Sequence, residues 1–186
     1  MASPVVTLVL PIYNMERYLR ECLLSIRAQT FTDFEVIAVL DACTDRSEEI
    51  LNELKDERFI VLKKERNEGV GAASDTALKH ARGEFMARMD SDDVMEPERL
   101  RKEVEFLRSN PDVDVVGTWF DYIDEHGRFL RNPYRFPTAH EEIRHGFRVQ
   151  MNMGGPTTMY RTERVRAVGG FSTDLRIAED LQVMLK

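Results

Sequence analysis

The chain has 186 residues, 42% apolar and 32% charged, and its 26 Lys and Arg against 33 Asp and Glu give a net charge of −7. These values predict one soluble globular domain with a sizeable core. The acidic balance excludes proteins that bind nucleic acid through a clustered basic face, but it allows a phosphorylated small molecule if a cation or backbone amides supply positive charge.

The two cysteines, Cys22 and Cys43, stand apart and outside any C-x-x-C pattern. Neither a disulfide framework nor a zinc site is therefore predicted. The first residues, 1–4, lack the features of a signal peptide, and the strongest apolar run, 5–10, is too short to span a bilayer. We expect a protein of the reducing cytoplasm, either free or at the cytosolic face of the membrane, with no membrane span in this chain.

The sequence pattern predicts alternating strands and helices over the first 108 residues. Apolar runs predict buried strands at 5–10, 35–40, 59–62 and 84–89, the first of them ended by Pro11. Apolar residues at helical spacing predict a helix after each strand. These stripes are Leu19, Leu23 and Ile26; Ile50, Leu51 and Leu54; Val70, Ala73, Ala77 and Ala81; and Leu100, Val104 and Leu107. The order predicts an α/β fold with a mostly parallel central sheet flanked by helices.

Residues of the cap type precede three of these helices. Asn14 is the predicted cap of the first helix, Asp45 and Glu48 have the spacing of a capping box for the second, and Pro97 suits the first turn of the fourth. Each helix is therefore expected to begin close to these residues.

The chain beyond Pro111 has a different pattern. Strand-like segments at 113–123 and 129–135 flank a turn at 125–128, which predicts a mixed-sheet extension. A further strand is predicted at 155–161, and a last helix at 178–185 follows a break at the glycines 169–170.

Ligands of an open parallel sheet bind beyond the carboxyl ends of its strands, so the segments 11–14, 41–45 and 90–93 are the candidate sites. No glycine-rich dinucleotide turn follows the first strand, and no G-x-x-x-x-G-K-[ST] loop occurs. Rossmann dehydrogenases and P-loop proteins are therefore excluded. The partial glycine pattern at 69–71 is more typical of a loop that opens a tightly packed helix.

Each candidate side chain has a functional and a structural interpretation. Tyr13 either stacks on a base or packs in the core, and Asp41 either accepts a hydrogen bond from a base or caps a turn. Asp90, Asp92 and Asp93 form either a site for Mg²⁺ or Mn²⁺ or a solvated acidic turn, because carboxylates about 4 Å apart repel by roughly 4 kcal/mol unless a cation offsets the charge. In an extended chain the first and second of these aspartates point the same way and the third points elsewhere.

The acidic pair Glu179-Asp180 on the last predicted helix supplies either a general base or an exposed helix start. The four histidines show no metal-type spacing, and no G-x-S-x-G segment occurs. Zinc enzymes and serine hydrolases are therefore unsupported.

Taken in order, these segments resemble family 2 glycosyltransferases of the GT-A fold. The resemblance is carried by Leu8-Val9-Leu10-Pro11-Ile12-Tyr13-Asn14, Met89-Asp90-Ser91-Asp92-Asp93 and Ala178-Glu179-Asp180-Leu181, together with 25–31, 33–37, 41–45, 67–69, 83–85, 97–100 and 168–171. It covers nearly the whole chain. The departures from the family pattern are Leu40, Ala42, Cys43 and Ser74.

The resemblance implies metal-assisted transfer of a sugar, with inversion, from a nucleotide-diphosphate donor such as a UDP-sugar to a hydroxyl of a carbohydrate, lipid or protein. The implied donor contacts are Pro11, Tyr13, Asn14, Asp41 and Asp90; the implied ligands of Mg²⁺ or Mn²⁺ are Asp92 and Asp90; and the implied catalytic base is Asp180.

In this interpretation, residues 1–108 form the nucleotide-sugar half, and residues 109–186 form an acceptor and base half that is incomplete at its C-terminus. Two alternatives remain: a nucleotide-sugar-binding domain without turnover, and a nucleotidyltransferase, which would need a glycine-rich basic loop in place of 11–14.

Overall fold

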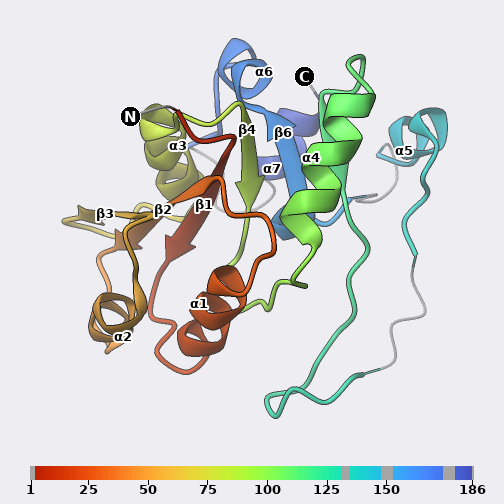
Figure 1. Ribbon diagram of the computed structural model, residues 1–186. Helices are drawn as coiled ribbons and strands as arrows, with labels where there is room; N and C mark the ends of the chain where they lie inside the picture. Colours follow the sequence, from red (N-terminus) through yellow and green to blue (C-terminus); the bar gives the residue numbers. More distant parts are fainter. Residues whose placement is uncertain (1–2, 131–134, 148–152, 174–178, 186) are drawn as a thin grey trace.

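A computed structural model describes residues 3–130, 135–147, 153–173 and 179–185. Within them, six strands form one mixed sheet in the order β3-β2-β1-β4-β6-β5 (Figure 1). The strands are β1 Val6–Ile12, β2 Phe34–Asp41, β3 Phe59–Lys64, β4 Phe85–Arg88, β5 Val115–Gly117 and β6 Thr158–Arg161. The first four are parallel, whereas β6 is antiparallel to both of its neighbours. The predicted α/β fold with a mostly parallel sheet is confirmed.

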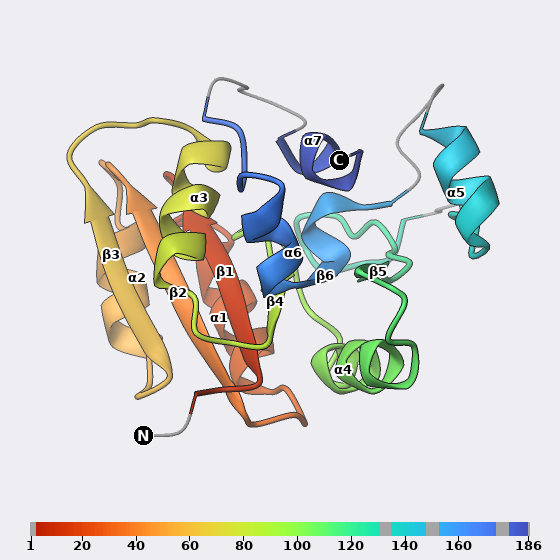
Figure 2. The same cartoon turned by 90° about the horizontal axis from the view of Figure 1, so that it is seen from above.

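Helices cover both faces of the sheet (Figure 2). Their bounds are α1 Leu19–Arg27, α2 Ser47–Leu54, α3 Val70–His80, α4 Arg99–Ser109, α5 His140–Gly146, α6 Thr162–Ala167 and α7 Glu179–Met184. One core cluster joins the sheet to α1, α2 and α4, and the other joins it to α3, α6 and α7. No helix of the described residues is long and apolar enough to span a bilayer.

The strand β1 shows why its sequence is apolar without alternation. Leu8, Leu10 and Ile12 belong to the first core cluster, whereas Val9 belongs to the second. Both faces of β1 are therefore buried, as expected for a central parallel strand. All the predicted helical stripes face a core, with Leu54 and Val70 at their margins.

The strand order places a crevice at one edge of the sheet. From β1 the chain moves outward through β2 and β3, and it then returns to the other side of β1 to form β4. Such a reversal of strand order leaves a crevice at the carboxyl ends of the two strands that flank it, here β1 and β4.

Pro11 lies inside β1 and does not end it, so that prediction was wrong. The oxygen of Val9 accepts a hydrogen bond from the amide of Met89, and Pro11, two residues on, faces the same side. Because β4 ends at Arg88, which pairs with Val9, this side has no further strand partner. The missing amide of proline therefore costs no sheet hydrogen bond.

Two predicted helix caps were also wrong. The helix α1 begins at Leu19 behind Tyr18, and no side chain caps it, so Asn14 lies upstream of the helix in a turn with a φ of 52°. The helix α2 begins at Ser47, whose amide donates to the carboxylate of Asp45 at 2.9 Å, while Glu48 forms an ion pair with Lys63 instead of closing a capping box.

The second half differs most from the prediction. The strand expected at 113–123 shortens to β5, and residues 118–130 extend away from the sheet as an irregular arm (Figure 1). The turn near 125–128 is confirmed, but a single bridge, Ile123 to Phe129, replaces the expected hairpin; residues 131–134 lie outside the described part. The predicted strand at 155–161 begins as a 3₁₀ turn, Gly155–Thr157, before β6. Neither α5 nor α6 was predicted.

Candidate active site

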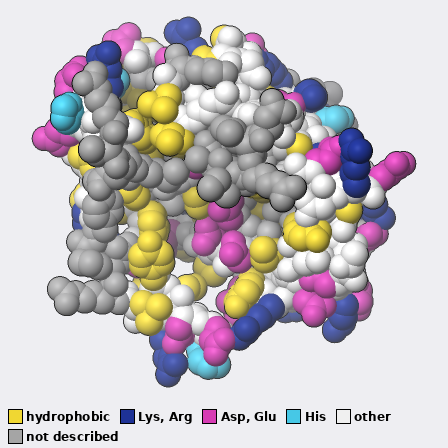
Figure 3. All heavy atoms as spheres, turned by 180° about the vertical axis from the view of Figure 1, so that it is seen from behind, with side chains coloured by type: hydrophobic (Ala, Val, Ile, Leu, Met, Phe, Trp, Pro, Cys, Tyr) yellow, Lys and Arg dark blue, Asp and Glu magenta, His cyan; other side chains and the backbone are white. Residues whose placement is uncertain are grey.

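The three segments singled out in the sequence lie at the carboxyl ends of the parallel strands β1, β2 and β4, at the same edge of the sheet. Seen from the back, acidic side chains gather near the middle of the face, next to apolar ones (Figure 3).

The loop after β1 presents an aromatic ring to solvent. Tyr13 is 44% exposed, which excludes the alternative that it packs in the core. The side chain of Asn14 accepts a hydrogen bond from the Thr44 amide at 2.8 Å and donates one to the Thr44 hydroxyl at 3.2 Å, so it ties the β1 and β2 loops together. Pro11 is buried within β1, directly before this loop.

Asp41, at the end of β2, is only 3% exposed. One carboxylate oxygen accepts the Gly69 amide at 2.8 Å, and the Glu68 amide lies 3.1 Å and 3.2 Å from the two oxygens. The ammonium of Lys64 lies 3.9 Å away. Asp41 therefore fixes the loop before α3, in which Gly69 has a φ of 90° that L side chains rarely adopt.

The acidic segment after β4 is a turn and not an extended chain, so the argument from alternating side chains was wrong. The amide of Asp93 donates to the carbonyl of Asp90 at 3.2 Å, which folds residues 90–93 into a tight turn. Asp92 and Asp93 are exposed. Surrounding protein atoms nevertheless displace part of the water around the Asp93 carboxyl group, and this desolvation, together with the charges of Asp90 and Asp92, raises the pKa of Asp93 to about 6.

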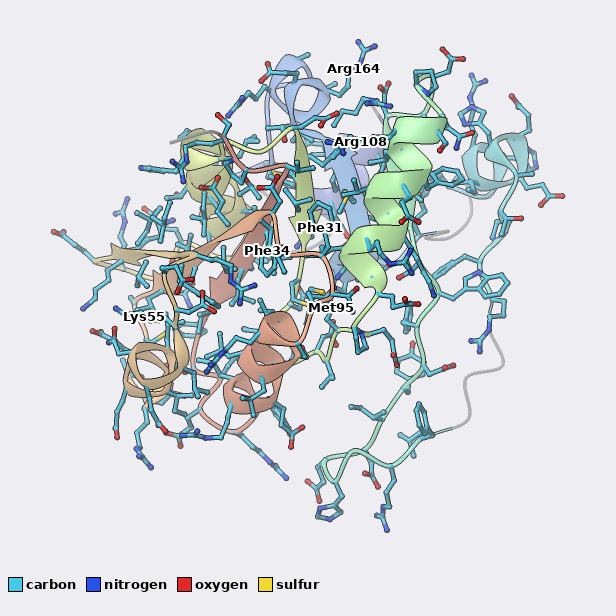
Figure 4. All side chains as sticks on the ribbon, in the orientation of Figure 1. Phe31, Phe34, Lys55, Met95, Arg108 and Arg164 are labelled. Atoms are coloured by element: carbon cyan, nitrogen blue, oxygen red, sulfur yellow. The ribbon has the colours of Figure 1, made fainter. Side chains whose placement is uncertain are left out.

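This turn is anchored on both sides. Before it, the guanidinium of Arg99 donates to the carbonyl of Arg88 at 2.9 Å. After it, the amide of Met95 donates to the hydroxyl of Ser25 in α1 at 3.0 Å, which fixes the segment leading to α4 (Figure 4). The acidic turn is therefore held between α1 and α4.

No three His, Cys, Asp or Glu residues of the described chain converge in the manner of a complete metal site. Mg²⁺ and Mn²⁺ bound with a diphosphate, however, commonly use only one or two protein carboxylates, with phosphate and water completing the coordination. The charges of Asp90 and Asp92 act on the Asp93 carboxyl group and add to the effect of desolvation in raising its pKa. Hard oxygen donors and excess negative charge fit a divalent cation.

Asp180, the predicted base, is 7% exposed. One arginine of β4, Arg88, lies between its carboxylate and that of Asp90. Arg88 places Nη1 3.5 Å from Asp180 Oδ2 and Nη2 3.8 Å from Asp90 Oδ1. Because the two terminal nitrogens belong to one planar guanidinium, the two carboxylates lie within about 10 Å of each other. The structure thus brings the predicted base to the acidic turn.

Sequence reasoning missed Arg88 and Gly155. Arg88 is a charged residue in an otherwise apolar strand, which was the available sign of a special role. A Cβ on Gly155 would lie 1.9 Å from Asp180 Oδ2, so only glycine leaves room for the carboxylate. No sequence pattern indicated that second contact.

With this geometry established, comparison with known proteins gives the family. The profile for Glycosyl transferase family 2 matches residues 7–169. The chain belongs to this family. The uncharacterized glycosyltransferase MJ1057 of Methanocaldococcus jannaschii is 42% identical over 135 residues, which are 70% of this chain and 47% of that protein.

Solved structures have a similar fold over nearly the whole chain. TarS of S. aureus in complex with UDP-GlcNAc has a TM-score of 0.78 and 29% identity, covering 97% of this chain and 52% of that one. The mannosyltransferase PcManGT of Pyrobaculum calidifontis, in complex with GDP-Man and Mn²⁺, has a TM-score of 0.73 and 22% identity over 98% of this chain and 51% of that one, and it supports the fold alone. The chain spans about half the length of these proteins.

Proposed function

We propose that this chain transfers a sugar, with inversion, from a nucleoside-diphosphate donor, most simply a UDP-sugar, to an acceptor hydroxyl. The observation that carries the proposal is the link from the acidic turn through Arg88 to Asp180, which puts a candidate base beside the crevice between β1 and β4. Family membership and the likeness to TarS, solved with UDP-GlcNAc, support a nucleotide-sugar donor.

The donor lies across the ends of β1, β2 and β4 in this proposal. The exposed ring of Tyr13 stacks on the base, and the loops tied by Asn14 shape its pocket. Asp41, because its carboxylate already accepts two backbone amides, contributes mainly by fixing the pocket wall. Asp90 contacts the ribose.

Asp92, with Asp90, holds Mg²⁺ or Mn²⁺. When bound, the cation offsets the negative charge of the diphosphate, including the charge that develops as the leaving group departs. Contacts with the diphosphate that become stronger in the transition state lower the activation barrier of sugar transfer. Contacts that are equally strong in the ground state and the transition state do not.

Asp180 accepts the proton of the acceptor hydroxyl. The oxygen attacks the anomeric carbon from the face opposite the diphosphate, the bond from that carbon to the diphosphate oxygen breaks, and the configuration inverts. The nucleoside diphosphate leaves with the electron pair of the broken bond. We place this reaction in the cytoplasm, in line with the free thiols of Cys22 and Cys43.

A donor-turnover assay of wild type and Asp180→Asn tests the proposal. The substitution keeps the shape of the side chain but removes the base, so turnover should fall by roughly 10²- to 10⁴-fold while the affinity for UDP stays nearly unchanged. Full turnover in Asp180→Asn would refute the base assignment. Wild-type protein that binds donor without hydrolysing or transferring its sugar would instead support a binding domain.

A further inference from the structure

We propose that Arg88 is a positioning residue for the base: its guanidinium joins Asp180 to Asp90 and holds the Asp180 carboxylate at the donor crevice. The inference rests on the proposed function, because it assigns a role within the same site. The side chain of Arg88, in the central strand β4, is only 3% exposed although it carries a positive charge.

The surroundings of Arg88 explain how the sheet tolerates this charge. Asp180 Oδ2 lies 3.5 Å from Nη1, Asp90 Oδ1 lies 3.8 Å from Nη2, and the Phe171 ring centroid lies 5.5 Å from the guanidinium carbon. The Asp180 side chain is 10% exposed and that of Asp90 is 40% exposed. One terminal nitrogen therefore faces a buried carboxylate, and the other faces a carboxylate at the crevice.

A planar guanidinium constrains the orientation of its partners in addition to supplying positive charge. Its terminal nitrogens form a rigid fork, so an arginine that contacts two carboxylates constrains where both of them point. Its positive charge also offsets the repulsion that Asp180 would experience near the acidic turn and a diphosphate. Lysine supplies the charge without the fork, which provides a graded test.

Gly155 reinforces the same arrangement from the opposite side. A Cβ there would lie 1.9 Å from Asp180 Oδ2 and 3.4 Å from Arg88 Nη1. The φ of Gly155 is not in the left-handed region, so alanine is compatible with the backbone and its methyl group would displace the carboxylate. Gly155→Ala thus perturbs the position of Asp180 without removing a charge.

The simple alternative is that Arg88 only stabilises the fold. Arg161 in β6 provides a comparison, because it donates to the carbonyls of Val113 and Leu107 and its guanidinium lies 5.6 Å from the Phe85 ring. Among the described residues, Arg161 has a structural role and forms no ion pair with Asp90 or Asp180. Gly154 likewise serves as a control for Gly155, since a Cβ there would meet the Phe120 ring at 2.9 Å.

The experiment combines thermal unfolding, UDP titration and donor turnover on Arg88→Met, Arg88→Lys, Asp180→Asn and the double variant Arg88→Met with Asp180→Asn. We expect Arg88→Met to lower turnover about 100-fold, near the lower end of what a positioned base contributes, with UDP affinity kept within about tenfold. Arg88→Lys should recover part of the turnover. The double variant should be no slower than Asp180→Asn, because a displaced base and an absent base fail at the same step.

If Arg88→Met does not fold, the glycine variants still test the positioning role. Gly155→Ala should lower turnover with UDP affinity retained, whereas Gly154→Ala and Arg161→Met should change thermal stability without lowering turnover per folded molecule. Wild-type turnover in Arg88→Met or Gly155→Ala, or losses that multiply in the double variant, would overturn the positioning role. An Asp180→Asn variant with full turnover would instead refute the proposed function, so the two failures are distinguishable.

Discussion

The substitution Asp41→Asn tests whether the carboxylate of Asp41 has a structural role or is free to contact a ligand. The carboxylate accepts the backbone amides of Glu68 and Gly69, and it is 3% exposed. In asparagine one oxygen becomes an NH₂ group, which cannot accept either amide, and the negative charge beside Lys64 is lost. The oxygen that remains can still accept both amides from the Oδ2 position, at 2.8 Å and 3.2 Å, but both hydrogen bonds lose their charge, and the new NH₂ group then lies 3.1 Å from the Glu68 amide.

The magnitude follows from these contacts. A hydrogen bond to a charged group contributes about 1.5–3 kcal/mol and one to a neutral group about 0.5–1.5 kcal/mol, so weakening both hydrogen bonds should lower the free energy of unfolding by about 2–3 kcal/mol. Urea unfolding followed by circular dichroism measures it, with an unchanged m value as evidence that the same two states are compared.

Asp124→Asn is the matched control. Its carboxylate also accepts two backbone amides, from His126 at 2.9 Å and Arg128 at 3.0 Å, but in an exposed turn. Water can replace those contacts, so the loss should be clearly smaller. An Asp41→Asn protein within about 0.5 kcal/mol of wild type, an effect typical of surface substitutions, would refute the proposed structural role of Asp41.

Two further predictions follow from single side chains. Tyr13→Ala should weaken UDP binding by about 1–3 kcal/mol while Tyr13→Phe keeps it, because stacking needs the ring and not the hydroxyl; calorimetry measures both, and equal losses would contradict stacking. Glu103 lies buried beside Arg99, and burial raises its pKa to about 7 from its usual 4.5. Since the folded protein then holds this proton more tightly than the unfolded chain, stability should fall as pH rises from about 4.5 to about 7. Unfolding at pH 5 and 8 should show a smaller fall in Glu103→Gln than in wild type, and an equal fall would exclude Glu103 as the cause.

The first half of the fold was predictable because its pattern is local and repeated. A run such as Val5 to Leu10 is apolar without alternation, and this indicates a strand buried on both faces wherever it occurs. The stripe of Leu19, Leu23 and Ile26 likewise fixes the buried face of a helix. Both features depend on near neighbours in sequence.

The errors arose where a distant partner competes with a local role. Asn14 has the side chain of a helix cap, but it hydrogen-bonds with Thr44 of the next loop instead. Residues 113–123 contain strand-forming side chains, yet only Val115–Gly117 find a partner strand, in β6. Local propensity is overridden by such tertiary contacts.

The candidate site was predictable in its parts but not in its connections. Ordered motifs singled out Tyr13, Asp41 and Asp180, each at the end of a strand or on a helix. The pairing of Arg88 with Asp180, and the space that Gly155 leaves for the carboxylate, join segments far apart in sequence and follow only from the fold.

The proposed transfer requires a nucleoside diphosphate and a divalent cation to bind together at the acidic turn. Calorimetric titration of UDP into wild type and Asp92→Asn, each with and without Mn²⁺, tests this most directly. We predict that Mn²⁺ strengthens UDP binding to wild type by about tenfold or more, equivalent to about 1.4 kcal/mol, and that Asp92→Asn loses this gain. Equal binding with and without Mn²⁺ in both proteins, or no binding of UDP to wild type, would contradict it.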